Sequence, residues 1–138
     1  MSDADDFKDC TGCVCAAIRR ASRAATQHYQ RHFRGTGLRG TQFSMLTVLI
    51  RGGPMPMGRM AKLLGVERTT LTRNLRPLEK KQWIKIEGEV DGRVRFVSIT
   101  PKGRAVAKAA LPAWRKAQAS IGPKIKELRL LEVLARAT

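Results

Sequence analysis

The chain has 138 residues and a formal net charge of +16 at pH 7. This length allows one domain-sized core, or two small lobes that share helices, and it argues against a second, independent enzyme domain. No acidic residue occurs between Asp9 and Glu67, although that interval contains nine arginines and lysines. Such a surface attracts polyanions, so charge alone leaves nucleic acid, an anionic membrane surface or an acidic protein as the partner.

The first ten residues, MSDADDFKDC, are acidic and have neither the basic nor the apolar region of a secretory signal peptide. No apolar run approaches the ~20 residues that a membrane-spanning helix needs. The three cysteines, Cys10, Cys13 and Cys15, are an odd number clustered near one end, unlike the framework of a secreted disulfide-rich protein. We therefore expect a cytoplasmic protein without a membrane partner.

The first predicted element is a long amphipathic helix over residues 9–34. Its apolar side chains recur at spacings of three and four residues; they are Val14, Ile18, Ala21, Ala25, Tyr29 and Phe33. Glycines at positions 35, 37 and 40 end this helix. Thr41 is expected to cap a second helix, which ends at Gly52 and Gly53.

Residues 57–80 carry the most informative pattern in the chain. A short helix near residues 57–64 is followed by Gly65, which can take the turn, and by a helix that runs to about Lys80. On a helical wheel, one face of the later helix is apolar and the opposite face is polar. The apolar face carries Leu71, Leu75 and Leu78, and the polar face carries Thr69, Thr72, Arg73 and Arg76. This order predicts a helix-turn-helix whose second helix enters a DNA major groove.

Two strand-like runs follow, over residues 83–87 and 93–99, with Asp91 and Gly92 between them as turn residues. This hairpin is the expected wing. Thr100 and Pro101 then form a capped helix start, and that helix should continue towards Trp114. After a break at residues 122–123, a last helix is expected with an apolar stripe of Ile125, Leu128, Leu131 and Leu134.

These elements predict a mainly α (α+β) fold in one chain, residues 1–138. A winged helix-turn-helix lobe spans residues 41–103, and helices over residues 9–34 and 104–138 flank it. The flanking helices present apolar faces that one small protomer can hardly cover. They therefore predict a homodimer, and the alternative is that they fold back on one another.

At its central motifs the chain resembles the MarR family of bacterial transcription regulators. The motifs are GVERTTLTR, RPLEKKQWI, DGR and VSITPKG, and the resemblance extends over nearly the whole length. The stretch CAAIRRASRAATQHYQRHFRGTGLRGTQFSML is similar to a branch whose first helix starts with clustered cysteines. There are two departures from the family pattern: Gln82 stands where glycine often precedes the wing, and the C-terminal segment is short.

The resemblance implies that the chain binds double-stranded DNA at a pseudo-palindromic operator. It places Arg93 of the wing in a minor groove, and Arg suits both grooves because its planar fork can bind guanine and fits a narrow, electronegative groove. Asp91 either braces an arginine, Arg73 or Arg93, or is an ordinary turn residue. The residues implied to face the major groove are Arg68, Thr69, Thr70, Thr72 and Arg73. Those implied to contact phosphates are Arg59, Arg76 and Arg95.

In the family, a crevice between the dimer helices and the reading lobe commonly receives a small organic effector. The residues predicted to line it are His28, Tyr29, Gln42, Phe43 and Met45. For Phe43, plain hydrophobic core is an equally good interpretation. His28 and His32 have a spacing suitable for zinc, but the sequence offers no clear third and fourth ligand.

The cysteine cluster is compatible with soft-metal binding, with a redox pair or with small apolar packing. On a helix, Cys10 and Cys13 share a face while Cys15 points away, so coordination by three thiols requires a non-helical start. No cofactor is expected. Nor do we expect an enzyme, because the sequence shows no nucleophile beside a base, no phosphate-binding glycine loop and no paired carboxylates in an apolar setting.

Three classes of function are compatible with the sequence. The first is a ligand-responsive repressor, the second a non-specific, chromatin-like basic protein, and the third a thiol- or metal-responsive regulator. The threonine-rich reading face and the single wing favour sequence-specific binding, and hence the first class over the second.

Overall fold

The computed structural model describes residues 2–88 and 94–125. Its chain order is α1 (Asp3–Asp6), a 3-10 turn η1 (Lys8–Gly12), α2 (Val14–Phe33), α3 (Gly40–Gly52), β1 (Met55–Pro56), α4 (Met57–Leu64), α5 (Arg68–Lys80), β2 (Ile84–Glu87), β3 (Phe96–Ile99), α6 (Pro101–Ile121) and η2 (Gly122–Lys124). The mainly α, winged helix-turn-helix prediction is confirmed. None of the described helices is both long and apolar enough to span a lipid bilayer.

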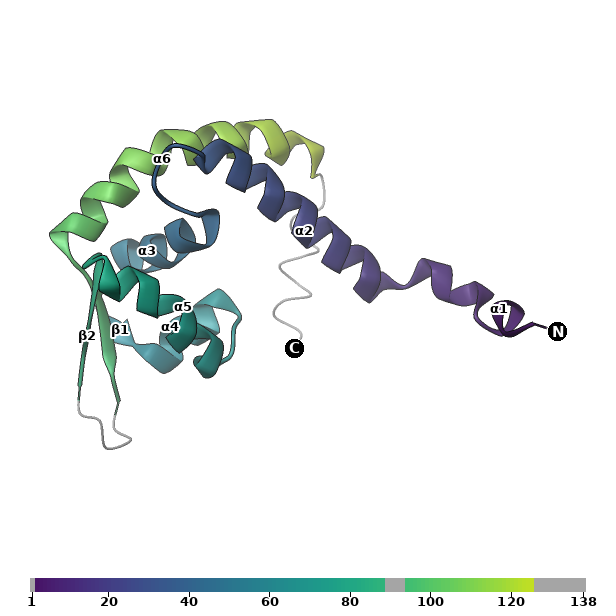
Figure 1. The fold of residues 1–138 in the computed structure, drawn as a ribbon, viewed down its shortest axis with the longest axis horizontal. Coiled ribbons are helices and arrows are strands. Elements are labelled where there is room, and N and C mark those ends of the chain that lie inside the picture. The colour runs from purple at the N-terminus through teal and green to yellow at the C-terminus, as the bar shows by residue number, and fades with distance from the viewer. Residues whose placement is uncertain (1, 89–93, 126–138) are drawn as a thin grey trace.

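The helices lie in two parts around α3. In Figure 1, α4, α5 and the sheet lie on one side of α3, and α2 and α6 cross on its other side. The end of α2 that begins at Val14 projects away from this body together with α1. This projecting part is exposed, including Val14 and Ile18, whose residue surfaces are 67% and 40% accessible.

Several boundaries differ from the predicted ones. The first long helix begins at Val14 rather than at residue 9, because residues 8–12, which include the poor helix formers Thr11 and Gly12, adopt a 3-10 turn instead. The next helix begins at Gly40 rather than after Thr41, and the backbone N–H of Arg39 donates to Gln42 Oε1 at 3.0 Å. The predicted C-terminal helix after Ile125 and the turn at Asp91 and Gly92 lie outside the described residues.

The sheet has three antiparallel strands in the order β1-β3-β2. Ile84 pairs with Ile99 and Glu87 with Phe96, which gives the expected hairpin. The two-residue strand β1 was not predicted from the sequence. It pairs Met55 with Val97, and the N–H of Met57 at the start of α4 donates to the Arg95 carbonyl at 2.9 Å. The hairpin is therefore attached to the helix-turn-helix through β1.

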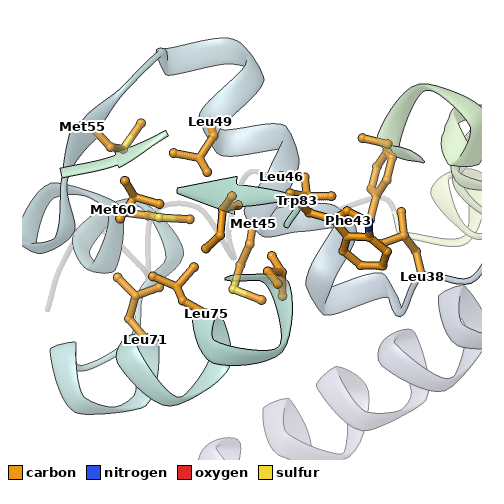
Figure 2. Packing of buried hydrophobic residues seen from close by; sticks show 14 of the residues in the cluster. Leu38, Phe43, Met45, Leu46, Leu49, Met55, Met60, Leu71, Leu75 and Trp83 are labelled. Carbon is orange, nitrogen blue, oxygen red and sulfur yellow. The ribbon is translucent and has the colours of Figure 1, made fainter. Parts of the chain in front are cut away.

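The lobe core forms where α5 packs onto α3 and α4. Leu71 and Leu75 of α5 lie opposite Met60 of α4, with Leu46 and Leu49 of α3 completing the cluster (Figure 2). All five side chains are fully buried. Burial of side chains of this kind contributes about 1.5–3 kcal/mol each, so the apolar face of α5 fixes the orientation of the opposite face.

A close backbone contact fixes the start of α6 beside the end of α5. The Thr100 N–H donates to the Trp83 carbonyl at 3.0 Å, and the Thr100 hydroxyl donates to the Gln82 carbonyl at 2.6 Å. The same hydroxyl accepts from the Gly103 N–H at 3.0 Å, which confirms the predicted cap. A Cβ atom on Gly103 would lie 2.8 Å from the carbonyl carbon of Trp83 and 3.0 Å from its Cα. Only glycine fits there, and we call this arrangement the Trp83–Gly103 contact.

We predict that Gly103→Ala lowers the free energy of unfolding by about 1–3 kcal/mol, because the added methyl group overpacks a backbone contact that cannot relax independently. Urea denaturation measures this change. Gly58→Ala is the matched control, since a Cβ there meets nothing within 4 Å and alanine favours the helix by about 0.5–1 kcal/mol. Equal effects of the two substitutions would contradict the assignment.

Candidate nucleic-acid interface

The helix α5 has one buried face and one polar face, as its periodicity predicts. Leu71, Leu75 and Leu78 are fully buried. Thr70 and Thr72 are half-buried on the flanks of the polar face. The exposed residues of α5 include Arg68, Thr69, Arg73 and Arg76. The lobe thus holds a row of arginine and threonine side chains outward on a helix that packing has immobilised.

The turn before α5 sets its angle to α4. Gly65 adopts a left-handed conformation with φ of 67° and ψ of 33°. Its N–H donates to the Lys62 carbonyl at 3.2 Å, and the Val66 N–H donates to the Ala61 carbonyl at 3.0 Å. Ala61 is only 5% exposed, so its small side chain lets the two helices approach closely. This geometry is that of the helix-turn-helix predicted from the sequence.

The polar face of this motif carries arginines that form no ion pair in the part of the chain that the structure describes. Within residues 2–88 and 94–125, the ion pair that the structure shows joins Lys85 Nζ to Glu87 Oε1 at 2.9 Å, on the wing. Arg59 and Lys62 are exposed on α4, the helix that packs against α5. Arginines without carboxylate partners remain available for the phosphates and bases of a nucleic acid.

Thr72 illustrates how this face can read a base. Its hydroxyl donates to the Arg68 carbonyl at 2.9 Å, so its hydrogen is used within the helix. The oxygen can still accept a hydrogen bond, as from the amino group of cytosine, and the methyl group can contact that of thymine. Threonine at this position therefore offers an acceptor and an apolar contact together.

The wing residues have different positions in the structure. Arg95, assigned to a phosphate from the resemblance, is half-buried, and its Nε is buried without a hydrogen-bond partner among the described residues. A Cβ on Gly88 would lie 3.5 Å from the Arg95 Cγ, so the stem of this arginine lies along the hairpin. Asp91 and Arg93 lie outside the described residues.

Comparison with known proteins agrees with this geometry. The sequence model of the MarR family matches residues 38–93. The structure of the M. tuberculosis transcriptional regulator MosR in complex with DNA is 36% identical in sequence, with a TM-score of 0.81, over 91% of this chain and 95% of that one. The chain belongs to the MarR family.

Two further relatives support the same assignment. The HTH-type transcriptional regulator MhqR of Bacillus subtilis is 28% identical over 96 residues, which are 69% of this chain and 66% of MhqR. A probable transcriptional regulator from Pseudomonas aeruginosa is 26% identical, with a TM-score of 0.73, over 93% of this chain and 98% of that one. The resemblance stated from the sequence motifs is thereby confirmed, and this MarR-family chain is a transcriptional regulator.

The five residues predicted to line an effector crevice have different surroundings in this MarR-family chain. Met45 is 4% exposed and points into the lobe core (Figure 2). The side-chain oxygen of Gln42 accepts a hydrogen bond from the Arg39 backbone N–H at the start of α3. His28 Nε2 lies 3.0 Å from the Ala117 carbonyl of α6. The Tyr29 hydroxyl bonds Gln118 Oε1, and burial raises the pKa of this tyrosine, which keeps it protonated as a donor.

Two adjoining cavities include one each of these five residues in their lining. One, of about 280 Å³, is bounded by α2, α3 and α6 and includes Tyr29. The other, of about 610 Å³, lies between α3 and α6 and includes Phe43; we call it the α3–α6 cavity. Ser44 and Trp114 line both. The sequence did not predict the α6 wall of the larger cavity, although positions 104, 107, 108, 111 and 114 have the spacing of one helix face.

All three cysteines are exposed and free. Cys10 lies in the 3-10 turn, Cys13 precedes α2, and Cys15 lies in its first turn, so the start is non-helical, as three-thiol coordination would require. Yet the described part of the chain contains no group of three His, Cys, Asp or Glu side chains placed to hold a metal ion. His28 and His32 have rings 4.7 Å apart without a third ligand in that part.

Proposed function

We propose that this chain is a sequence-specific transcriptional repressor that binds a pseudo-palindromic DNA site as a homodimer and is released by a small-molecule effector. The observation that carries the proposal is the polar face of α5. There, three fully buried leucines hold threonines outward together with exposed arginines that form no ion pair among the described residues. MosR, 36% identical, is described in complex with DNA, which supports DNA as the polyanion bound here.

The role that we propose for each DNA-binding residue follows from its position in the fold. Arg68, Thr69, Thr70, Thr72 and Arg73 occupy the first turns of α5 and read bases in the major groove. Arg59 on α4 and Arg76 further along α5 contact phosphates, and Arg95 does so from the hairpin. Arg93, and Asp91 as its brace, extend the contact into the minor groove. Only the phosphate contacts are independent of sequence.

We predict that Arg73→Ala removes about 1–3 kcal/mol of binding free energy at the base pair that Arg73 reads, and that the protein then discriminates less between bases at that position. Arg59→Ala should instead lower the affinity for all DNA sequences by the same factor, and it should reduce the slope of log affinity against log salt concentration by about 1. In vitro selection of bound DNA supplies the site, and salt titrations with that site and a scrambled duplex measure both effects. If both substitutions lower specific and scrambled binding by the same factor, the two roles are wrongly assigned.

The projecting part of α2 supports the homodimer. Val14 and Ile18 lie on the same stripe as Ala21 and Ala25, and in one protomer the first two are 67% and 40% exposed. A second copy would bury this stripe through a two-fold contact. Two α5 helices would then face half-sites about one DNA turn, ~34–36 Å, apart.

We predict that Ile18→Lys shifts the protein towards monomers in sedimentation at micromolar concentration, because a charge replaces an apolar contact. Gln27→Lys is the matched control: it adds the same charge to the same helix but lies nine residues away, on the opposite face. The homodimer proposal fails if the unmodified chain sediments as a monomer that binds a single half-site with full affinity.

Release by an effector needs a ligand that distinguishes two conformations. A ligand that lowers DNA affinity about 100-fold must prefer the unbound conformation by about 2.7 kcal/mol. By thermodynamic linkage, bound DNA lowers the affinity of the protein for the ligand by the same factor. Two cavities between the lobe and the helices α2 and α6 provide room for such a ligand.

A thiol-responsive regulator is the second candidate, because three exposed cysteines lie within six residues. The Cys13 N–H donates to the Cys10 carbonyl at 3.2 Å, which places these two residues in one turn, within the reach of a disulfide. Hydrogen peroxide would convert both thiols to a disulfide, with release of two water molecules.

We predict that peroxide leaves the affinity for the selected DNA unchanged and that a variant with Cys10, Cys13 and Cys15 replaced by serine binds that DNA equally well. Fluorescence anisotropy of labelled duplex measures both. Loss of DNA binding on oxidation of the original chain, with no loss in the serine variant, would instead establish the cysteines as the sensing site.

A further inference from the structure

Helix α2 carries a row of arginines on the face opposite its apolar residues. Positions 20, 23, 27, 31 and 34 recur at intervals of three and four, so they share one side of the helix, and all five residues are exposed. Four of them are arginines: Arg20, Arg23, Arg31 and, at the C-cap, Arg34. We call this row, with the neutral Gln27 at its centre, the arginine stripe.

The arginine stripe lies on the side of α2 that faces away from the other helices. On the opposite side, the Tyr29 hydroxyl bonds Gln118 of α6, and the ring centroid of Phe33 lies 5.1 Å from that of Phe43 of α3. The helices α4 and α5 lie beyond α3, on its far side from α2 (Figure 1). The stripe is therefore a separate surface from the polar face of α5.

The helices around the stripe contain no acidic residue. Neither α2 nor the two helices that pack against it, α3 and α6, has an aspartate or a glutamate in its sequence. Arg20 and Arg23 are three residues apart, a spacing at which like charges on a helix repel each other. Solvent-exposed helix faces commonly alternate in the sign of their charges. This face carries positive charge alone, and it therefore attracts polyanions.

The stripe matches the phosphate backbone of a nucleic acid. A guanidinium group is planar and can bind a phosphate with two hydrogen bonds, whereas a lysine acts as a point charge. Arg20 and Arg31 are eleven residues apart, which corresponds to ~17 Å along a helix. Duplex DNA carries ~10 phosphate charges over that length of its axis. Several arginines can thus contact phosphates at the same time and release the counterions bound there.

We propose that the arginine stripe of α2 is a second surface for double-stranded DNA, which binds the phosphate backbone without reading bases. While α5 holds the operator, the stripe holds another duplex, so that the protein joins two DNA segments. This joining rests on the proposed function, because it requires α5 to bind an operator. Binding of a duplex by the stripe does not depend on the operator.

The proposed homodimer leaves the stripe accessible. Val14 and Ile18, which a second copy would cover, belong to the apolar side of α2, opposite the arginines. A two-fold contact through that side presents one stripe on each protomer.

The fold argues against an anionic membrane as the partner. An amphipathic helix that binds a bilayer buries its apolar face among the lipids. In α2 part of that face is already occupied, since Phe33 is buried beside Phe43 and Tyr29 bonds α6. The stripe itself offers only polar groups. A regulator on its operator also has other duplex segments nearby at high effective concentration.

The test uses the full chain bound to a bead-immobilised duplex that carries its selected site, with a fluorescent scrambled duplex as the probe. The label retained over a range of salt concentrations gives the affinity of the second surface. Combining Arg23→Gln with Arg31→Gln should lower that affinity about ten-fold or more and reduce the salt slope by about 2, without loss of the immobilised site. Combining Lys102→Gln with Lys116→Gln removes the same charge from exposed positions of α6 and should change the affinity less than about two-fold.

Gln27 allows a test in both directions at one exposed position. Gln27→Lys extends the row of cations and should strengthen retention of the probe about five-fold. Gln27→Glu places a carboxylate in the middle of the stripe and should weaken retention by about the same factor. Unfolding would not explain that loss, because a glutamate four residues from both Arg23 and Arg31 stabilises the helix. Sedimentation checks that the assembly of each variant is unchanged.

The proposal is overturned if the probe is not retained, if the Arg23 and Arg31 variant retains it as well as the unmodified chain does, or if the two Gln27 variants behave alike. Retention of phosphatidylserine and phosphatidylcholine vesicles, but not of the duplex, would also overturn it in favour of a membrane. A chain that binds its selected site and retains no probe supports the proposed function and overturns the second surface. A chain that selects no site, yet binds the probe through the stripe in fluorescence anisotropy, contradicts the proposed function and supports the second surface.

Discussion

The arrangement of the molecule depends on the absence of a side chain at Gly103. Because the backbone of α6 approaches the Trp83 carbonyl directly, the first turn of α6 is fixed to the residues that follow α5. Thr100 completes this attachment by bonding both Gln82 and Gly103. The helix that bounds the larger cavity and the helix with the polar arginine face are thus parts of one connected frame, so their relative position is set by backbone contacts.

The sequence predicted those features that depend on local repetition. Leu71, Leu75 and Leu78 lie on one face of any α-helix, whatever surrounds it, and so the two faces of α5 were correctly expected. Thr100 followed by Pro101 is likewise a local signal, and the structure has a helix start there. The family motifs extended the prediction from single elements to the whole fold, because they specify the order of the elements as well as their type.

Features that depend on contacts between distant segments were missed. The strand β1 consists of Met55 and Pro56, too short for any periodicity, and it exists because β3 pairs with it. Helix α3 is buried on several sides, so its sequence could not show that Met45 faces the lobe core while Phe43 faces α6. The cavity wall on α6 has a regular spacing, but only the crossing of α3 and α6 turns that spacing into a cavity.

The short strand β1 has a mechanical consequence. Its pairing with β3 and the bond from the Met57 N–H to the Arg95 carbonyl join the hairpin to the first residue of α4. The hairpin and α4 therefore cannot tilt independently. In the proposed complex, Arg59 of α4 contacts a phosphate and the hairpin lies over the neighbouring minor groove. The distance between these two contacts is then fixed. The protein would then select DNA by the distance between a phosphate and the adjacent groove, which depends on the local stiffness and width of the duplex as well as on the bases that α5 reads.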